Sequence, residues 1–211
     1  MEFSFLYALQ EINNAVLDPI MIIASTLGND GFIWIVITVV LLFTKRFREC
    51  AIVMAIALLL SLLICNLTLK NLVARDRPFW IDEQVVLKIE EPTDFSFPSG
   101  HTFSSFAAAV TLFLYSRKMG TAALALAFTI AFSRLYLFVH FPTDVLASVV
   151  LGSATAGLAV VLFRKILLPT MKRAGWIALP VDVIEVLPVD TADTLPVDEV
   201  PEGGENEPGN D

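Results

Sequence analysis

Cysteine and histidine are scarce in this sequence, whose 211 residues include two of each. Cys50 and Cys65 lie fifteen positions apart on one predicted helix, a separation of roughly 22 Å along the helix axis. That is too far for a disulfide bond between them, so they say nothing about the redox compartment. The N-terminus lacks the basic region and the small-residue cleavage site of a secretory signal peptide, and we expect no cleaved leader.

Basic residues are missing from the C-terminal part of the chain. Residues 174–211 contain ten acidic residues and no basic one, whereas residues 1–173 contain 12 acidic and 14 basic residues. The net charge of −8 therefore belongs to the C-terminal segment. Because no basic patch is present, no nucleic-acid partner is expected.

The same segment repeats the sequence Leu-Pro-Val-Asp three times, beginning at Leu179, Leu187 and Leu195, and has no aromatic residue after Trp176. A segment that is acidic, punctuated by proline and poor in aromatic residues cannot bury a hydrophobic core. We therefore predict that residues 174–211 form an acidic disordered cytoplasmic tail. Whether the repeats bind a partner is left open, and the sequence identifies none.

Apolar residues are abundant: 56% of the chain is hydrophobic and 17% charged, with a mean hydropathy of +0.72. Repeated apolar runs near ~20 residues indicate a multi-span helical membrane protein. We predict an all-α fold, a six-helix membrane bundle within residues 15–173, preceded by an interfacial amphipathic segment at residues 1–14. The predicted spans are residues 17–27, 32–43, 51–69, 102–115, 119–138 and 145–168. Whether the short first span fully crosses the membrane is left open.

The basic residues predict how this bundle is oriented. Nine of them fall on one face of the six-span layout, which places that face in the cytoplasm. They are Lys45, Arg46, Arg48, Arg117, Lys118, Arg164, Lys165, Lys172 and Arg173. The opposite face carries the five basic residues that break this bias, namely Lys70, Arg75, Arg77, Lys88 and Arg134. Positive charge is therefore needed for something on the non-cytoplasmic face.

Three clusters of polar residues lie at the ends of predicted spans three to six. They are Lys70-x6-Arg77-Pro78, Pro98-Ser99-Gly100-His101 and Ser133-Arg134-x5-His140-x3-Asp144. An up-and-down bundle places all of these helix ends on the non-cytoplasmic side. Ionisable groups between bilayer-length apolar segments are costly, so they are functional candidates.

The types of residue in these clusters suit a phosphate group. Ser99 is expected to cap the following helix and leave the backbone N–H groups of Gly100 and His101 free, an arrangement that binds phosphate. The glycine allows a ligand to approach the backbone closely. Lys70 and Arg77 supply positive charge, and arginine can bind phosphate oxygens through two donors. A structural alternative is open for this pair, as interfacial side chains that snorkel toward water.

The remaining side chains of the clusters suit catalysis. His140, held by Asp144 one helical turn later, can act as a nucleophile. His101 can protonate a leaving group. Arg134 can bind phosphate, although a structural pairing with Asp144 is also open. Arg75 and Lys88 are interpreted as loop or headgroup contacts.

The three motifs together resemble the type-2 phosphatidic acid phosphatase superfamily over roughly residues 51–168. The resemblance implies that His140 is the nucleophile, Asp144 its partner and His101 the general acid. It also implies a set of phosphate-binding residues: Lys70, Arg77, Ser99, Gly100 and Arg134. The phosphatase members use no metal, so no cofactor is expected.

The sequence therefore predicts an integral membrane phosphatase that hydrolyses a lipid phosphate or diphosphate, with undecaprenyl diphosphate as first choice. Phosphatidylglycerophosphate or phosphatidate is the alternative substrate, because the motifs read only the phosphate. A non-catalytic protein that binds or transports lipid phosphates is the alternative of another class. We expect the protein in a bacterial plasma membrane with its site facing outside the cytoplasm.

Overall fold

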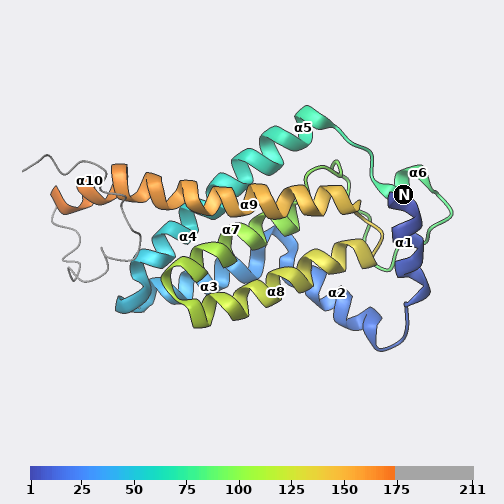
Figure 1. The fold of residues 1–211 in the computed structure, drawn as a ribbon, viewed down its shortest axis with the longest axis horizontal. Coiled ribbons are helices and arrows are strands. Elements are labelled where there is room, and N and C mark those ends of the chain that lie inside the picture. Colours follow the sequence, from blue (N-terminus) through green and yellow to red (C-terminus); the bar gives the residue numbers. More distant parts are fainter. Residues whose placement is uncertain (174–211) are drawn as a thin grey trace, which may run out of the picture.

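The computed structural model describes residues 1–173, and every regular element in this range is helical (Figure 1). In the N-terminal half these are α1 (Glu2–Glu11), α2 (Leu17–Gly28), η1 (Asn29–Gly31), α3 (Phe32–Phe43), η2 (Lys45–Phe47), α4 (Arg48–Ser61), η3 (Leu62–Leu69), α5 (Lys70–Val73) and α6 (Pro78–Ile81). They are followed by α7 (Gly100–Tyr115), α8 (Arg117–Tyr136), α9 (Pro142–Leu162), η4 (Phe163–Leu167) and α10 (Leu168–Arg173). The tail predicted for 174–211 lies outside the described residues.

Four helical runs in the described part of the chain are long and apolar enough to cross a membrane. They are Leu17–Phe43, Lys45–Ile81, Arg117–Tyr136 and Pro142–Met171. These runs confirm the all-α membrane fold. The predicted fourth span corresponds to α7, which has 16 residues and lies in the centre of the bundle, packed against α4, α8 and α9.

The first two predicted spans form one helical run, so the count of six spans is not confirmed. Each of α2 and α3 has 12 residues, about 18 Å of helix, whereas the hydrocarbon core is about 30 Å thick. Between them, η1 holds Asp30 at φ 51° and Gly31 at φ 71°. This left-handed pair bends the chain without reversing it.

Contacts with the neighbouring helices show that α2 and α3 continue in one direction. Asp18 at the start of α2 accepts a hydrogen bond from Tyr136 at the end of α8. Further along, Gly28 lies against Ile130. Trp34 of α3 then donates to Ser105, which lies one turn into α7. The run Leu17–Phe43 therefore passes from one end of the bundle toward the other.

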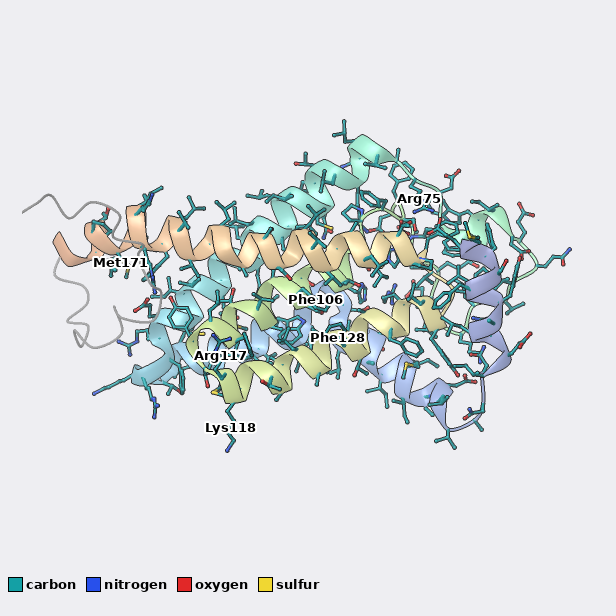
Figure 2. The ribbon with its side chains drawn as sticks, in the orientation of Figure 1. Arg75, Phe106, Arg117, Lys118, Phe128 and Met171 are labelled. Atoms are coloured by element: carbon teal, nitrogen blue, oxygen red, sulfur yellow. The ribbon has the colours of Figure 1, made fainter. Side chains whose placement is uncertain are left out.

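Helix α7 is the core of the bundle, and small residues let its neighbours approach. Its buried residues include Phe103 and three consecutive alanines, 107–109. Phe106 meets Phe128 of α8 edge to face, with ring centroids 4.9 Å apart (Figure 2). Gly152 of α9 lies so close to α7 that an added Cβ would be 2.5 Å from the carbonyl oxygen of Phe103. Close approach at small residues is typical of membrane helix packing.

The two ends of the bundle differ in their side chains. Figure 2 shows Arg117, Lys118 and Met171 at one end and Arg75 at the other. Helix α1 lies at the Arg75 end (Figure 1), where Phe3 packs on Phe138 and Phe141. The ends of the helices that carry the three motifs meet there too.

Candidate active site

A cavity of about 1090 Å³ opens at the α1 end of the bundle, and its lining includes most of the sequence-predicted site. Six of the eight predicted residues line it: Lys70, Arg77, Gly100, His101, Arg134 and His140. Ser99 and Asp144 do not line it, and both are 0% exposed. The structure thus brings residues from three distant motifs to one place.

His140 is positioned by the tight turn that joins α8 to α9. Within this turn Phe138 adopts a positive φ of 61°, and the N–H of Val139 donates to the carbonyl of Arg134. The imidazole that follows is 1% exposed, with Nε2 3.4 Å from Nη1 of Arg77. Because a guanidinium can only donate, we assign the lone pair to Nε2 and the proton to Nδ1. The lone pair of Nε2 is then engaged only by this long contact with Arg77, on a residue that lines the cavity.

A serine stands between the histidine and its aspartate. Nδ1 of His140 lies 3.6 Å from Oδ2 of Asp144, which is longer than a hydrogen bond. The Oγ of Ser96 lies 3.5 Å from the same Nδ1 and donates to Oδ2 of Asp144 at 2.5 Å. Asp144 therefore lies beside the imidazole as expected, and Ser96, which the motifs do not contain, bridges the two.

Burial sets the protonation of this histidine. Removal of the ring from water lowers the pKa of His140 well below its usual value, and the positive charges of Arg77 and Arg134 lower it further. Asp94 opposes this shift only weakly. The imidazole is therefore neutral near pH 7, as a nucleophile must be.

Lys70 and Arg77 share one carboxylate. Both side chains form ion pairs with Asp94, and Arg77 also donates to the backbone carbonyls of Asp94 and Val139. Lys70 is 5% and Arg77 2% exposed, which rules out the snorkelling alternative for this pair. Although burial alone would raise it, the pKa of Asp94 falls to about 2 because the two cations stabilise the carboxylate.

Arg134 is the least neutralised cation of the cavity. It is 2% exposed, its Nη1 donates to the hydroxyl of Ser25, and its buried Nε has no hydrogen-bond partner. Among the described residues no carboxylate forms an ion pair with it, so the alternative pairing with Asp144 is wrong. A buried donor without a partner costs about 1–3 kcal/mol, which an anionic ligand can recover.

The start of α7 supplies Gly100 and His101 to the cavity. The expectation that Ser99 caps this helix is not met. Ser99 occupies the N-cap position, yet its side chain makes no capping hydrogen bond. Its hydroxyl instead accepts from Thr102. A Cβ on Gly100 would lie 3.0 Å from Oδ1 of Asn66, so a side chain there would crowd η3.

His101 is held by a residue that the motifs do not contain. Its Nε2 lies 2.8 Å from Oδ1 of Asn29 in η1. Because an amide oxygen only accepts, we assign the proton of the neutral ring to Nε2. Nδ1 is then the nitrogen that can take up and release a catalytic proton.

Sequence reasoning missed five residues that hold the site. They are Ser25, Asn29, Arg75, Asp94 and Ser96. Each acts through a side-chain contact with a partner far along the chain, which no spacing rule reports. Ser96 directly precedes the second motif, and the Gly-Asn-Asp-Gly sequence around Asn29 was recognised only as a turn. Their chemistry could have suggested them as candidates, but their partners could not have been inferred.

Comparisons with known proteins agree with this geometry. The family model described as the PAP2 superfamily matches residues 50–167, a range that contains all three motifs. An undecaprenyl-diphosphatase of Sulfolobus acidocaldarius is 35% identical over 147 residues, covering 69% of this chain and 70% of that protein. The undecaprenyl-diphosphatase BcrC of Bacillus subtilis is 28% identical over 140 residues, covering 66% and 72%.

Two solved structures share the fold. One is a transmembrane PAP2-type phosphatidylglycerolphosphate phosphatase from Bacillus subtilis, with a TM-score of 0.63, 26% identity and coverage of 77% of this chain and 84% of that one. The other is LpxE from Aquifex aeolicus, with a TM-score of 0.61, 22% identity and coverage of 75% and 94%. The second likeness concerns the fold alone.

Proposed function

This chain belongs to the PAP2 superfamily, and from that premise we propose that it hydrolyses undecaprenyl diphosphate through a phosphohistidine formed on His140. Its relatives and its apolar helices make it an integral membrane phosphatase that acts on lipid phosphates. The identity of the lipid and the roles of the individual residues are the proposal.

The observation that carries the proposal is the imbalance of buried charge in the cavity. Lys70, Arg77 and Arg134 are each at most 5% exposed; the first two pair with Asp94, and Arg134 pairs with no carboxylate among the described residues. Buried charge without a counter-ion is expensive, so the cavity favours an anionic ligand. A phosphoryl group fits, because its oxygens can accept from both guanidinium groups at once.

The geometry supports an in-line transfer in two steps. In the first, Nε2 of His140 forms a bond to phosphorus while the bond from phosphorus to the leaving oxygen breaks, and His101, which starts this step protonated on both nitrogens, gives that oxygen the proton of Nδ1. In the second, water attacks the phosphohistidine, His101 takes a proton from the water, and the bond from Nε2 to phosphorus breaks. While Nε2 is bonded to phosphorus the ring carries positive charge, which Asp144 stabilises through Ser96, and the three cations hold the phosphoryl oxygens in both steps.

The cavity also suits a substrate with a long apolar tail. Beyond the cations its lining includes Ile35, Leu58, Leu59 and Leu62, which belong to membrane-spanning runs. A lipid can therefore keep its tail at membrane depth while its phosphate reaches His140. Undecaprenyl diphosphate is favoured by the relatives from Sulfolobus and Bacillus, and phosphatidylglycerophosphate by the 26% identical structure.

We further propose that the site faces away from the cytoplasm in the plasma membrane. The support is the distribution of basic residues. The end of the bundle opposite the cavity carries Lys45 and Arg46 of η2 and, at the start of α8, Arg117 and Lys118. An excess of lysine and arginine in short loops marks the cytoplasmic side.

The test is phosphate release by the purified full-length protein from undecaprenyl diphosphate, phosphatidylglycerophosphate and phosphatidate in detergent. With terminally ³²P-labelled diphosphate, rapid quenching should trap an acid-labile, base-stable label on the His140 peptide. His140→Ala should abolish the label and lower kcat at least about 10³-fold. Binding of all three lipids without phosphate release would favour the non-catalytic alternative. Label on another residue would overturn the mechanism.

A further inference from the structure

Arg75 contacts the catalytic carboxylate without lining the cavity. Its Nη1 donates to Oδ1 of Asp144 at 2.6 Å, an ion pair whose acidic side chain is 0% exposed. Arg75 is not among the residues that line the cavity. It lies at the end of the bundle where α1 packs (Figure 2). The side chain of Arg75 therefore reaches the site through the aspartate, while its backbone carbonyl accepts from the N–H of Ser96 at 2.8 Å.

The two oxygens of Asp144 have separate tasks. Oδ2 accepts from the hydroxyl of Ser96 at 2.5 Å and from the backbone N–H of Phe141 at 2.9 Å. Oδ1 accepts from Arg75. A buried carboxylate is tolerated when it is paired, and one whose partner is removed is left with an uncompensated charge. Arg75 therefore supplies the counter-charge of this carboxylate and fixes its rotation, which aims Oδ2 at Ser96.

Arg75 is itself held on three sides. Nη2 forms an ion pair with Glu2 of α1 at 2.7 Å, and Nη1 donates to the hydroxyl of Thr143 at 2.7 Å. The guanidinium lies 4.1 Å from the ring centroid of Phe141. Glu2 also accepts from the backbone N–H and the hydroxyl of Thr143. The contacts thus run from α1, outside the matched range 50–167, to the start of α9.

We propose that Arg75 is a positioning residue for the nucleophile, acting in the order Glu2, Arg75, Asp144, Ser96, His140. Arg75 holds Asp144, Asp144 orients the Ser96 hydroxyl, and that hydroxyl favours the tautomer of His140 with its proton on Nδ1. The consequence for turnover rests on the proposed function. The effect on the tautomer does not, because it can be observed without substrate.

The kinetic test replaces the arginine and measures phosphate release from undecaprenyl diphosphate. Arg75→Gln should lower kcat about 10–100-fold, the usual cost of removing a group that orients a functional histidine through its partner, with a much smaller change in KM. Arg75→Lys should recover part of this loss. Millimolar guanidinium should partly rescue Arg75→Ala, because the side chain is 29% exposed. Arg46→Gln is the matched control, since that exposed arginine also stacks on a phenylalanine but touches no carboxylate within residues 1–173.

The spectroscopic test needs no activity. With only two histidines in the chain, ¹⁵N-imidazole spectra contain two rings, which His101→Gln assigns. The wild type should show His140 with its proton on Nδ1, and Arg75→Gln should shift these signals toward a mixture of tautomers. Arg46→Gln should leave them unchanged. If Arg75→Gln does not fold, Glu2→Gln should give the same shift more weakly and lower kcat about two- to fivefold, as for an exposed ion pair.

The outcomes separate this inference from the proposed function. Tautomer shifts without phosphatase activity in any protein would support the inference and reject the function. Phosphatase activity with unchanged His140 signals in folded Arg75→Gln would overturn the inference and leave the function. If Arg75→Gln lost thermal stability but kept a normal kcat and normal spectra, the inference would be overturned. Arg75 would then only connect α1 to α9.

Discussion

His140 lies in the α8–α9 turn beside two guanidinium groups, and this surrounding determines how its reactivity should depend on pH. Burial first, and the charges of Arg77 and Arg134 second, lower the pKa of His140 well below its usual value. The nucleophile is neutral above its folded-state pKa and is lost only when pH falls through it. Near pH 6.5, where an ordinary histidine takes up its proton, the ring should still be neutral.

We therefore predict that the acid limb of the kcat/KM profile lies below pH 6.5. The profile would be measured between pH 4 and 9 at constant ionic strength, because kcat/KM reports groups of the free enzyme. Protein stability should be followed in parallel, since the same lowered pKa makes folding less favourable as pH falls below about 6.5. An acid limb at or above pH 6.5 in folded protein would contradict the burial argument.

Arg134 combines a fixed hydrogen bond with an unused one. Its Nη1 is engaged by Ser25, while its Nε is buried and has no partner. We predict that Arg134→Lys lowers kcat/KM about 10–100-fold, the cost of one charge-assisted hydrogen bond at ~1.5–3 kcal/mol. Lysine keeps the charge but cannot present two donors in one plane. Activity close to wild type in Arg134→Lys would assign the arginine a structural role.

The sequence predicted which side chains gather at the candidate site, but not the residues that support them. His140 and Asp144 are found by residue type and spacing, because the turn into α9 fixes their relative positions, and His101 is found by its motif at the start of α7. Ser96 and Arg75 reach Asp144 across separations of 48 and 69 residues. Such contacts depend on how the helices finally pack, so spacing along the chain contains no record of them.

The contact between helices α7 and α9 depends on the absence of a side chain at Gly152. At Gly152 an added Cβ would lie 2.5 Å from the backbone oxygen of Phe103, and backbone cannot move aside as a flexible side chain can. Gly157 on the same helix has open space at its Cβ position, with nothing within 4 Å. The two glycines therefore form a matched pair on α9.

We predict that Gly152→Ala destabilises the protein by about 1–3 kcal/mol, the usual cost of overpacking. Gly157→Ala should be neutral or stabilising by up to about 1 kcal/mol, because alanine favours helix more than glycine does. Thermal unfolding in detergent, followed by circular dichroism, would measure both. Equal effects of the two substitutions would mean that α9 does not pack on α7 as closely as the structure has it.

The break between α2 and α3 shows the limit of turn signals. Gly28-Asn29-Asp30-Gly31 predicted that the helix stops, and η1 lies there. Whether the chain then reverses or continues depends on which surfaces it finds, and here α2 packs on α8 while α3 packs on α4. Two short apolar segments were therefore counted as two spans where the structure has one bent run.

This single run changes the topology of the whole molecule. With Leu17–Phe43 as one crossing, α1 lies at the same end as the cavity, and Glu2 can reach Arg75 and Thr143. Six alternating spans would place residues 1–14 at the opposite end, beside Lys118. The contacts between α1 and the site thus require an odd number of crossings between α1 and the end of α9 that lies away from the cavity.

We predict that single cysteines at Glu11→Cys and Glu83→Cys react with a membrane-impermeant maleimide in intact cells, and that Lys118→Cys reacts only after permeabilisation. All three positions are exposed in the structure, and the native Cys50 and Cys65 are 0% exposed, so background labelling should be low. The expected side follows from the basic residues at the Lys118 end. Labelling of Glu83→Cys but not Glu11→Cys would restore the six-span topology and separate α1 from the site. Labelling of Lys118→Cys alone would place the cavity on the cytoplasmic side.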